Sequence, residues 1–156
     1  MTTPPNLWLC LVRAGLVTGV VDGLFSSALA AFVYGSTVTR LWQGVASTLL
    51  GAAALQGGTR TAAIGLAMHF GVAVAWSAVF LLLVLSSPWL RDVLASPYGV
   101  IAVATVYGPV IWMVMSLAIV PLLTHRPPAI NIRWWVQFVG HIPFVAAPIV
   151  TLIARA

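Results

Sequence analysis

The sequence contains very little charge, and it has no lysine and no glutamate. Only 6% of its 156 residues are charged, namely seven arginines, Asp22 and Asp92, whereas a typical soluble domain has about 25%. Hydrophobic residues make up 62% of the chain, and the mean hydropathy is +1.08. Because so few charges cannot cover a soluble domain with polar surface, the composition predicts a protein whose surface faces lipid.

Cysteines and enzyme motifs are also scarce. Cys10 is the single cysteine, which excludes an internal disulfide and a cysteine-based zinc site. The chain has no glycine-rich phosphate loop, no HExxH zinc signature and no recognisable nucleophile motif. We therefore predict no enzymatic activity, no catalytic residues and no metal-binding residues.

In a soluble protein, the net charge of +5 would suggest nucleic-acid binding. Here the arginines stand singly at the ends of apolar runs, where they would meet phospholipid headgroups. The expected partner is therefore the lipid bilayer and not nucleic acid.

Long apolar runs dominate the rest of the chain. The run 62–85 has 24 residues without a charge. At about 1.5 Å per residue, a helix of this length crosses the roughly 30 Å hydrocarbon core of a bilayer. Similar runs at 14–35, 98–123 and 134–153 predict an all-α polytopic membrane protein. We expect a four-transmembrane-helix bundle that forms a single domain over 1–156.

Four spans place both ends of the chain on one side of the membrane. Three arginines fall on that side and four on the other, so the positive-inside rule does not set the orientation. A short polar loop is expected around Arg91 and Asp92. Five tryptophans fall near the ends of spans and are expected to form an aromatic belt at the membrane interface: Trp8, Trp42, Trp89, Trp134 and Trp135.

The segment 41–57, between the first two spans, is apolar but rich in small residues. At about 17 residues it is marginally short for a membrane crossing. Gly44, Thr48 and Gly51 share one helical face, which makes that face smooth and suited to close packing on another helix. We predict an interfacial or partly re-entrant helix here, with a fifth span as the alternative.

Three ionisable residues lie within the spans: Asp22, His69 and His141. A charge at the bilayer centre costs at least about 2.5 kcal/mol, so such residues normally face the interior of a bundle. At about 1.5 Å per residue, both histidines lie about 10 Å from the same membrane face, and Asp22 lies within about 10 Å of them in depth.

Helical periodicity extends this set of polar residues. Thr18, Asp22 and Ser26 are spaced four residues apart and form a polar stripe on the first span, and Gln137 and His141 do the same on the last. The sequence therefore predicts one buried polar cluster, made of Thr18, Asp22, Ser26, His69, Gln137 and His141.

Several roles fit this cluster. Asp22 can be a neutral packing residue, a proton-handling group, or the partner of an arginine or of another chain. His69 and His141 can form structural hydrogen bonds between helices, titrate near neutral pH or act as axial ligands of a b-type haem. A transition-metal site lacks a third ligand other than Asp22. A small transporter or channel subunit lined by these residues is a further alternative.

The chain resembles a known family in the order of several short motifs. These are LWQGVASTLLGAAALQGG, IGLAMHF with His69, VYGPVIWMVMSLAIVPL, an RPP loop, and VGHIPFVAAPIV with His141. Over about residues 40–155 they resemble small, uncharacterised bacterial inner-membrane proteins related to YagU.

The resemblance implies a multi-pass protein of the bacterial inner (plasma) membrane with a role in stress or acid survival, and it supplies no catalytic residues. Together with the buried cluster, it leads us to predict a pH- or stress-responsive membrane module. The helix faces rich in glycine and alanine predict tight packing and self-association.

Overall fold

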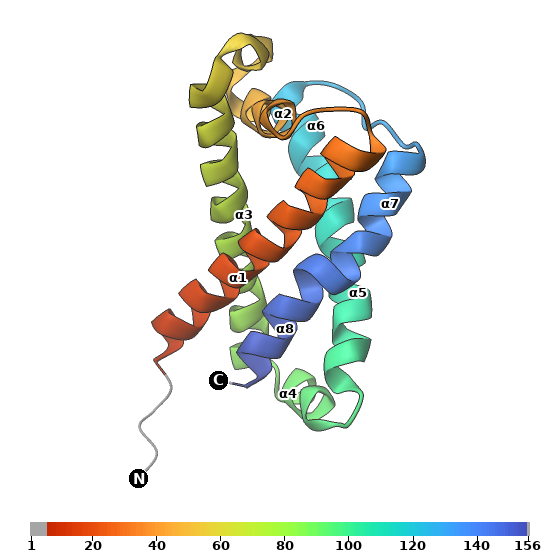
Figure 1. Cartoon of the computed structure of the whole chain (residues 1–156). Helices are drawn as coiled ribbons and strands as arrows, with labels where there is room; N and C mark the ends of the chain where they lie inside the picture. The colour runs from red at the N-terminus through yellow and green to blue at the C-terminus, as the bar shows by residue number, and fades with distance from the viewer. Residues whose placement is uncertain (1–5, 156) are drawn as a thin grey trace.

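The computed structural model describes residues 6–155, and every regular element among them is helical (Figure 1). Four helical stretches are long and apolar enough to cross a membrane: Leu7–Val33, Gly58–Ser86, Gly99–Thr124 and Ile132–Ala154. The predicted all-α bundle of four membrane helices is therefore confirmed, and the chain is a multi-pass membrane protein. Both ends of the described chain lie at the same end of the bundle (Figure 1).

The elements follow one another along the chain with short connections. They are α1 (Leu7–Ala28) with the π-helical η1 (Leu29–Val33), α2 (Val38–Leu50), the 3-10 helix η2 (Ala52–Gln56), α3 (Gly58–Ser86), α4 (Pro88–Ala95), α5 (Gly99–Val114) with the π-helical η3 (Met115–Ile119), α6 (Val120–Thr124), α7 (Ile132–His141) with the π-helical η4 (Ile142–Ala146), and α8 (Ala147–Ala154).

The helix that carries the first span begins at Leu7, seven residues before the predicted start of the span at residue 14. The side chain of Asn6 accepts a hydrogen bond from the backbone N–H of Leu9 (3.2 Å) and caps the helix. Arg13 consequently lies within the helix, with its side chain exposed, and does not mark the start of the span.

The polar loop predicted around Arg91 and Asp92 is also wrong, because these residues belong to the short helix α4. Ser87 caps this helix by accepting a hydrogen bond from Leu90 N–H (3.2 Å). The Arg91 guanidinium donates to the carbonyl of Val84 (2.7 Å), one of the free carbonyls at the end of α3. Arg91 therefore caps the C-terminal end of α3.

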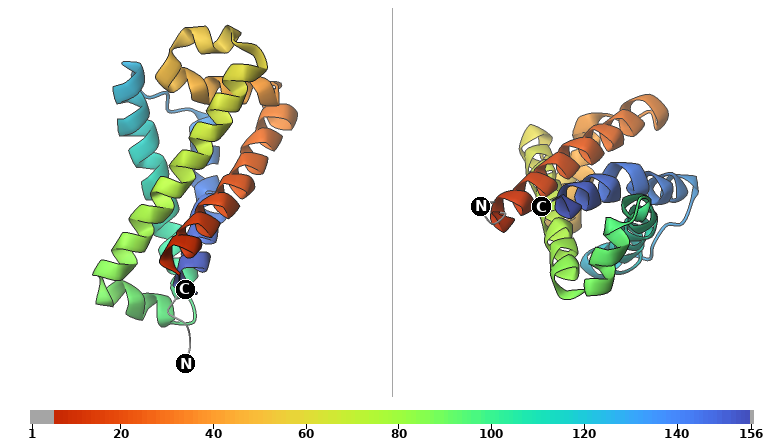
Figure 2. Two further views of the ribbon diagram at one scale, coloured as in Figure 1. Left: turned by 90° about the vertical axis from the view of Figure 1, so that its left-hand side faces the viewer. Right: turned by 90° about the horizontal axis from the view of Figure 1, so that it is seen from below.

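Helix α2 lies across the end of the bundle opposite the termini and does not run along it (Figures 1 and 2). It is therefore not a fifth span, and with η2 it covers the predicted segment 41–57. The face that packs on α3 carries the buried residues Trp42, Gln43 and Ala46. A Cβ atom added at Gly44 would have no neighbour within 4 Å, so the smooth glycine face points away from the bundle.

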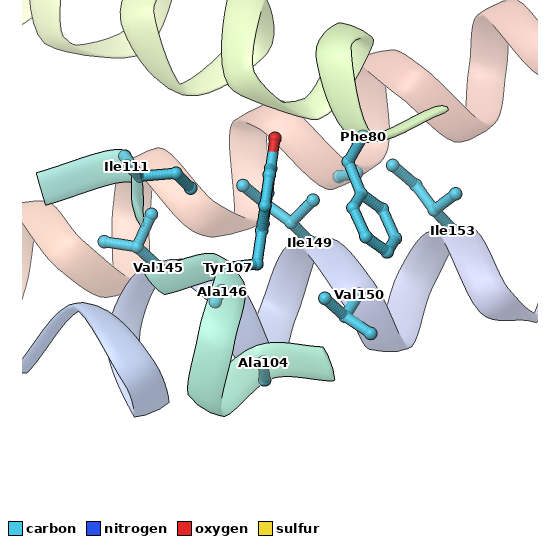
Figure 3. Close-up of a cluster of buried hydrophobic side chains, with 10 residues drawn as sticks. Phe80, Ala104, Tyr107, Ile111, Val145, Ala146, Ile149, Val150 and Ile153 are labelled. Carbon is cyan, nitrogen blue, oxygen red and sulfur yellow. The ribbon is translucent and has the colours of Figure 1, made fainter. Parts of the chain in front are cut away.

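The apolar core joins buried residues of α3, α5, η4 and α8 (Figure 3), which come from the parts of these helices nearer to the termini. Phe80 of α3 and Tyr107 of α5 lie with ring centroids 4.9 Å apart, and Ile149 and Val150 of α8 pack beside them fully buried. The Tyr107 hydroxyl donates to the Trp76 carbonyl (2.7 Å). The buried phenol of Tyr107 therefore has a hydrogen-bond partner. The predicted polar residues lie in the other half, toward α2.

Two glycines of α3 allow a matched test of the close contact between α2 and α3. A Cβ atom at Gly65 would lie 1.8 Å from the Trp42 carbonyl oxygen, whereas one at Gly71 would meet nothing within 4 Å. We expect Gly65→Ala to push α2 away and to destabilise the fold by about 1–3 kcal/mol. The control Gly71→Ala should be neutral or stabilise by up to about 1 kcal/mol.

Unfolding of the purified protein in mild detergent, followed by circular dichroism, measures both changes. Equal stability of the two variants would contradict the close backbone contact between α2 and α3.

Candidate functional site

Asp22 and His69 meet between α1 and α3. The carboxylate Oδ2 of Asp22 lies 3.8 Å from Nδ1 of His69, and the two side chains are 13% and 15% exposed. The helices can approach because α1 presents glycines at the contact: a Cβ atom at Gly19 would lie 2.4 Å from the Phe70 ring. Small residues at such contacts are typical of membrane helix pairs. The two polar residues are thus held face to face inside the bundle.

The contacts of His69 assign a hydrogen-bonding role to each of its two ring nitrogens. Nε2 lies 3.0 Å from the Gly19 carbonyl oxygen, and because a carbonyl only accepts, Nε2 carries a proton. In the neutral ring Nδ1 therefore has no proton, and it faces the Asp22 carboxylate. A separation of 3.8 Å is too long for a direct hydrogen bond, but it suits an ion pair or a single bridging water.

Trp42 of α2 covers this pair. Its ring centroid lies 5.0 Å from that of His69, and the side chain is only 7% exposed. A Cβ atom at Gly23 would touch both residues, at 3.5 Å from His69 Nε2 and 3.7 Å from Trp42. Trp42 is thus a site residue that sequence reasoning missed.

The placement of Trp42 in an aromatic belt is wrong, because α2 folds back over the bundle and carries the ring inward. The same prediction is wrong for Trp134, which is 8% exposed and donates its ring N–H to the Ser116 hydroxyl (2.9 Å). Trp8, Trp89 and Trp135 are exposed as expected of an interfacial belt.

His141 lies at the end of α7 and is 8% exposed. Its Nδ1 donates to the carbonyl of Gln137 one turn earlier (2.7 Å), and its ring packs on Trp112 with centroids 4.8 Å apart. Gln137 therefore takes part through its backbone carbonyl, by fixing the His141 ring. Gly140, the residue before His141, packs against the Phe25 ring of α1.

Several buried polar atoms near this cluster have no hydrogen-bond partner within residues 6–155. They include Thr18 Oγ1, Asp22 Oδ1 and the ring N–H of Trp112. Thr18 lies one turn before Asp22 and is fully buried, while Ser26 lies one turn after it and is partly buried. Buried polar groups normally find partners, so these atoms leave hydrogen-bonding capacity in the interior that no group of the described residues uses.

The histidines fit a haem poorly. Both ring nitrogens of His69 face protein groups, so axial ligation would require breaking the bond to Gly19 or displacing Asp22. His141 keeps Nε2 free of protein partners in the part of the chain that the structure describes. Among the same residues, no three His, Cys, Asp or Glu side chains are grouped as a metal site would need. Binding of haem b stays a prediction, which an absorbance spectrum of the purified protein would decide.

Comparison with known proteins adds no relative. No family model matches the chain, and no similar curated protein or solved structure was found. The resemblance to inner-membrane proteins related to YagU and the expected self-association both stay predictions.

A double-mutant cycle tests whether Asp22 and His69 act as a pair. We expect Asp22→Asn and His69→Gln to be non-additive in unfolding free energy, with a coupling of about 0.5–3 kcal/mol, as for residues in contact. The control pairs Asp22→Asn with His125→Asn, because His125 lies in the connection after α6 in a left-handed backbone conformation that asparagine tolerates. Denaturation in detergent micelles measures both cycles.

For the control pair, effects that add to within about 0.5 kcal/mol are expected. Additivity in the Asp22–His69 cycle would show that the two side chains do not interact.

Proposed function

We propose that this protein is a non-enzymatic, pH-responsive module of the bacterial inner membrane that serves in stress adaptation. The proton-binding element is the Asp22–His69 pair. The observation that carries the proposal is the facing of a carboxylate oxygen and a histidine ring nitrogen, 3.8 Å apart and largely buried.

The chemistry of this pair is simple. When the carboxylate is ionised and Nδ1 is free, the pair binds one proton and becomes an ion pair or a neutral acid beside a neutral imidazole. A second proton leaves a buried cation next to a neutral acid. Because the interior screens charge weakly, each step changes the forces between α1 and α3.

Helix α2 is the element best placed to respond. Trp42 packs on the His69 ring, and a protonated imidazole is attracted to an indole face by its charge, whereas a neutral one is not. The backbone of α2 also contacts Gly65, one turn before His69 on α3. Protonation of His69 therefore acts directly on the contact between α2 and α3.

Trp42 emission provides the test. We expect the difference between the wild-type protein and Trp42→Phe, which isolates this ring from the other tryptophans, to show a transition between about pH 5 and 8. Asp22→Asn and His69→Gln should abolish the transition, because each removes one member of the proton-binding pair.

His125→Asn changes a histidine away from the pair, so the transition should persist in this variant. A transition that survives in both Asp22→Asn and His69→Gln would overturn the proposal.

A small transporter or channel subunit is the second candidate, and the unpartnered polar atoms support it. Thr18 and Trp112 carry buried polar atoms without a protein partner in the described chain, as the wall of a hydrated path would. Cysteine placed at Thr18 or Ser26 should then react with a water-soluble thiol reagent in a Cys10→Ser background. A complete lack of reaction at both positions counts against this candidate.

A further inference from the structure

An apolar groove runs along the outside of the bundle between α1 and the α7–η4 helix. Its volume is about 450 Å³, and its walls include Phe25, Trp135, Val139 and Phe144. Phe25 and Phe144 stack with ring centroids 4.1 Å apart and close one end. Gly140 leaves the space for this stack, since a Cβ atom there would lie 2.6 Å from the Phe25 ring. The groove is thus built by specific contacts between two spans.

The walls of the groove face outward. Ile132, Trp135 and Val139 are 76%, 52% and 60% exposed, although the surrounding chain is apolar enough to lie in a bilayer. At about 1.5 Å per residue, the stretch from Ile132 to Phe144 is about 18 Å long. One leaflet contributes about half of the 30 Å hydrocarbon core. The length of the groove therefore matches one acyl chain of one leaflet.

A cation lies next to the groove in the sequence, because Arg133 follows the lining residue Ile132. Arg133 lies in the first turn of α7 and is exposed, with its guanidinium carbon 4.5 Å above the ring centroid of Tyr34. Within residues 6–155 its guanidinium has no carboxylate partner. The contact with Tyr34 holds the charge between the end of η1 and the start of α7.

We propose that this groove binds one anionic phospholipid, with an acyl chain against Phe25, Val139 and Phe144 and the phosphate on Arg133. Guanidinium groups bind phosphate through two parallel charge-assisted hydrogen bonds, which explains a single arginine at this place. The site is separate from the Asp22–His69 pair and does not depend on the function proposed for it.

A second copy of the chain fits the groove less well than a lipid does. In a two-fold dimer the same patch of each copy meets its partner. The two Arg133 side chains would then approach each other without an acidic residue between them in the described part of the chain. A lipid phosphate supplies the missing negative charge.

Native mass spectrometry of the full chain, released from detergent micelles, tests the proposal. With phosphatidylglycerol in the micelles we expect one retained lipid per chain, and with phosphatidylcholine we expect little. Arg133→Gln should reduce retention of phosphatidylglycerol about tenfold or more, the loss expected for one charge-assisted contact.

The control is Arg60→Gln, an equal loss of charge at the same end of the bundle, on the exposed first turn of α3 and away from the groove. It should retain the lipid. Val139→Trp fills the groove without changing the charge, and it should also release the lipid. Because Val139 is largely exposed, this variant should unfold at the temperature of the wild-type protein.

Three results would overturn the proposal. Equal losses in Arg133→Gln and Arg60→Gln would indicate general attraction to anionic lipid. Full retention in Val139→Trp would place the lipid elsewhere. A lipid-free dimer that Val139→Trp dissociates would show that the groove binds a second copy.

Discussion

A carboxyl group inside an apolar helix bundle is the constraint on which this structure depends. Asp22 lies within an apolar span, where an unpaired charge is costly. Groups from three helices surround the carboxyl group: His69 faces the carboxylate, Gly19 lets α3 approach α1, and Trp42 of α2 covers the pair. The transverse position of α2 is part of this arrangement, because a fifth span or a freely floating helix would leave the pair uncovered.

The two halves of the bundle differ in the side chains that they bury. The half near the termini is held by apolar packing around Phe80, Tyr107 and Ile149, and the Tyr107 hydroxyl donates to the Trp76 carbonyl. The other half contains the polar atoms, several of them without a partner among the residues described. The tight apolar packing of one half is therefore separate from the polar groups of the other.

The sequence is enough to predict the four spans, because apolar runs of this length with at most one charged residue are favourable in a bilayer. It also predicts that Asp22 and His69 lie at similar depth, since depth follows from the helical rise, and the structure brings their side chains together. Trp42 could not be assigned in the same way. A tryptophan near the end of a span suits the membrane interface and the interior alike, and the direction in which α2 folds decides between them.

The remaining differences have local causes. The first helix gains its early start from the Asn6 cap and the apolar turn that follows it. Helix α4 forms at Arg91 and Asp92 because Ser87 caps it and Arg91 finds free carbonyls at the end of α3. Hydrogen bonds from side chains to the ends of helices are individually weak and depend on local geometry. The periodicity of apolar residues therefore does not predict them.

The two sites share one helix contact. Asp22 and Phe25 lie one turn apart on α1, and Gly140 and His141 are neighbours on α7, so the contact between these helices has the polar cluster on its inner side and the groove on its outer side. Gly140 sets the spacing, because any larger residue there would meet the Phe25 ring. A change in the distance between α1 and α7 therefore alters the electrostatics of the cluster and the width of the groove together. The absence of a single Cβ atom at residue 140 keeps both in place.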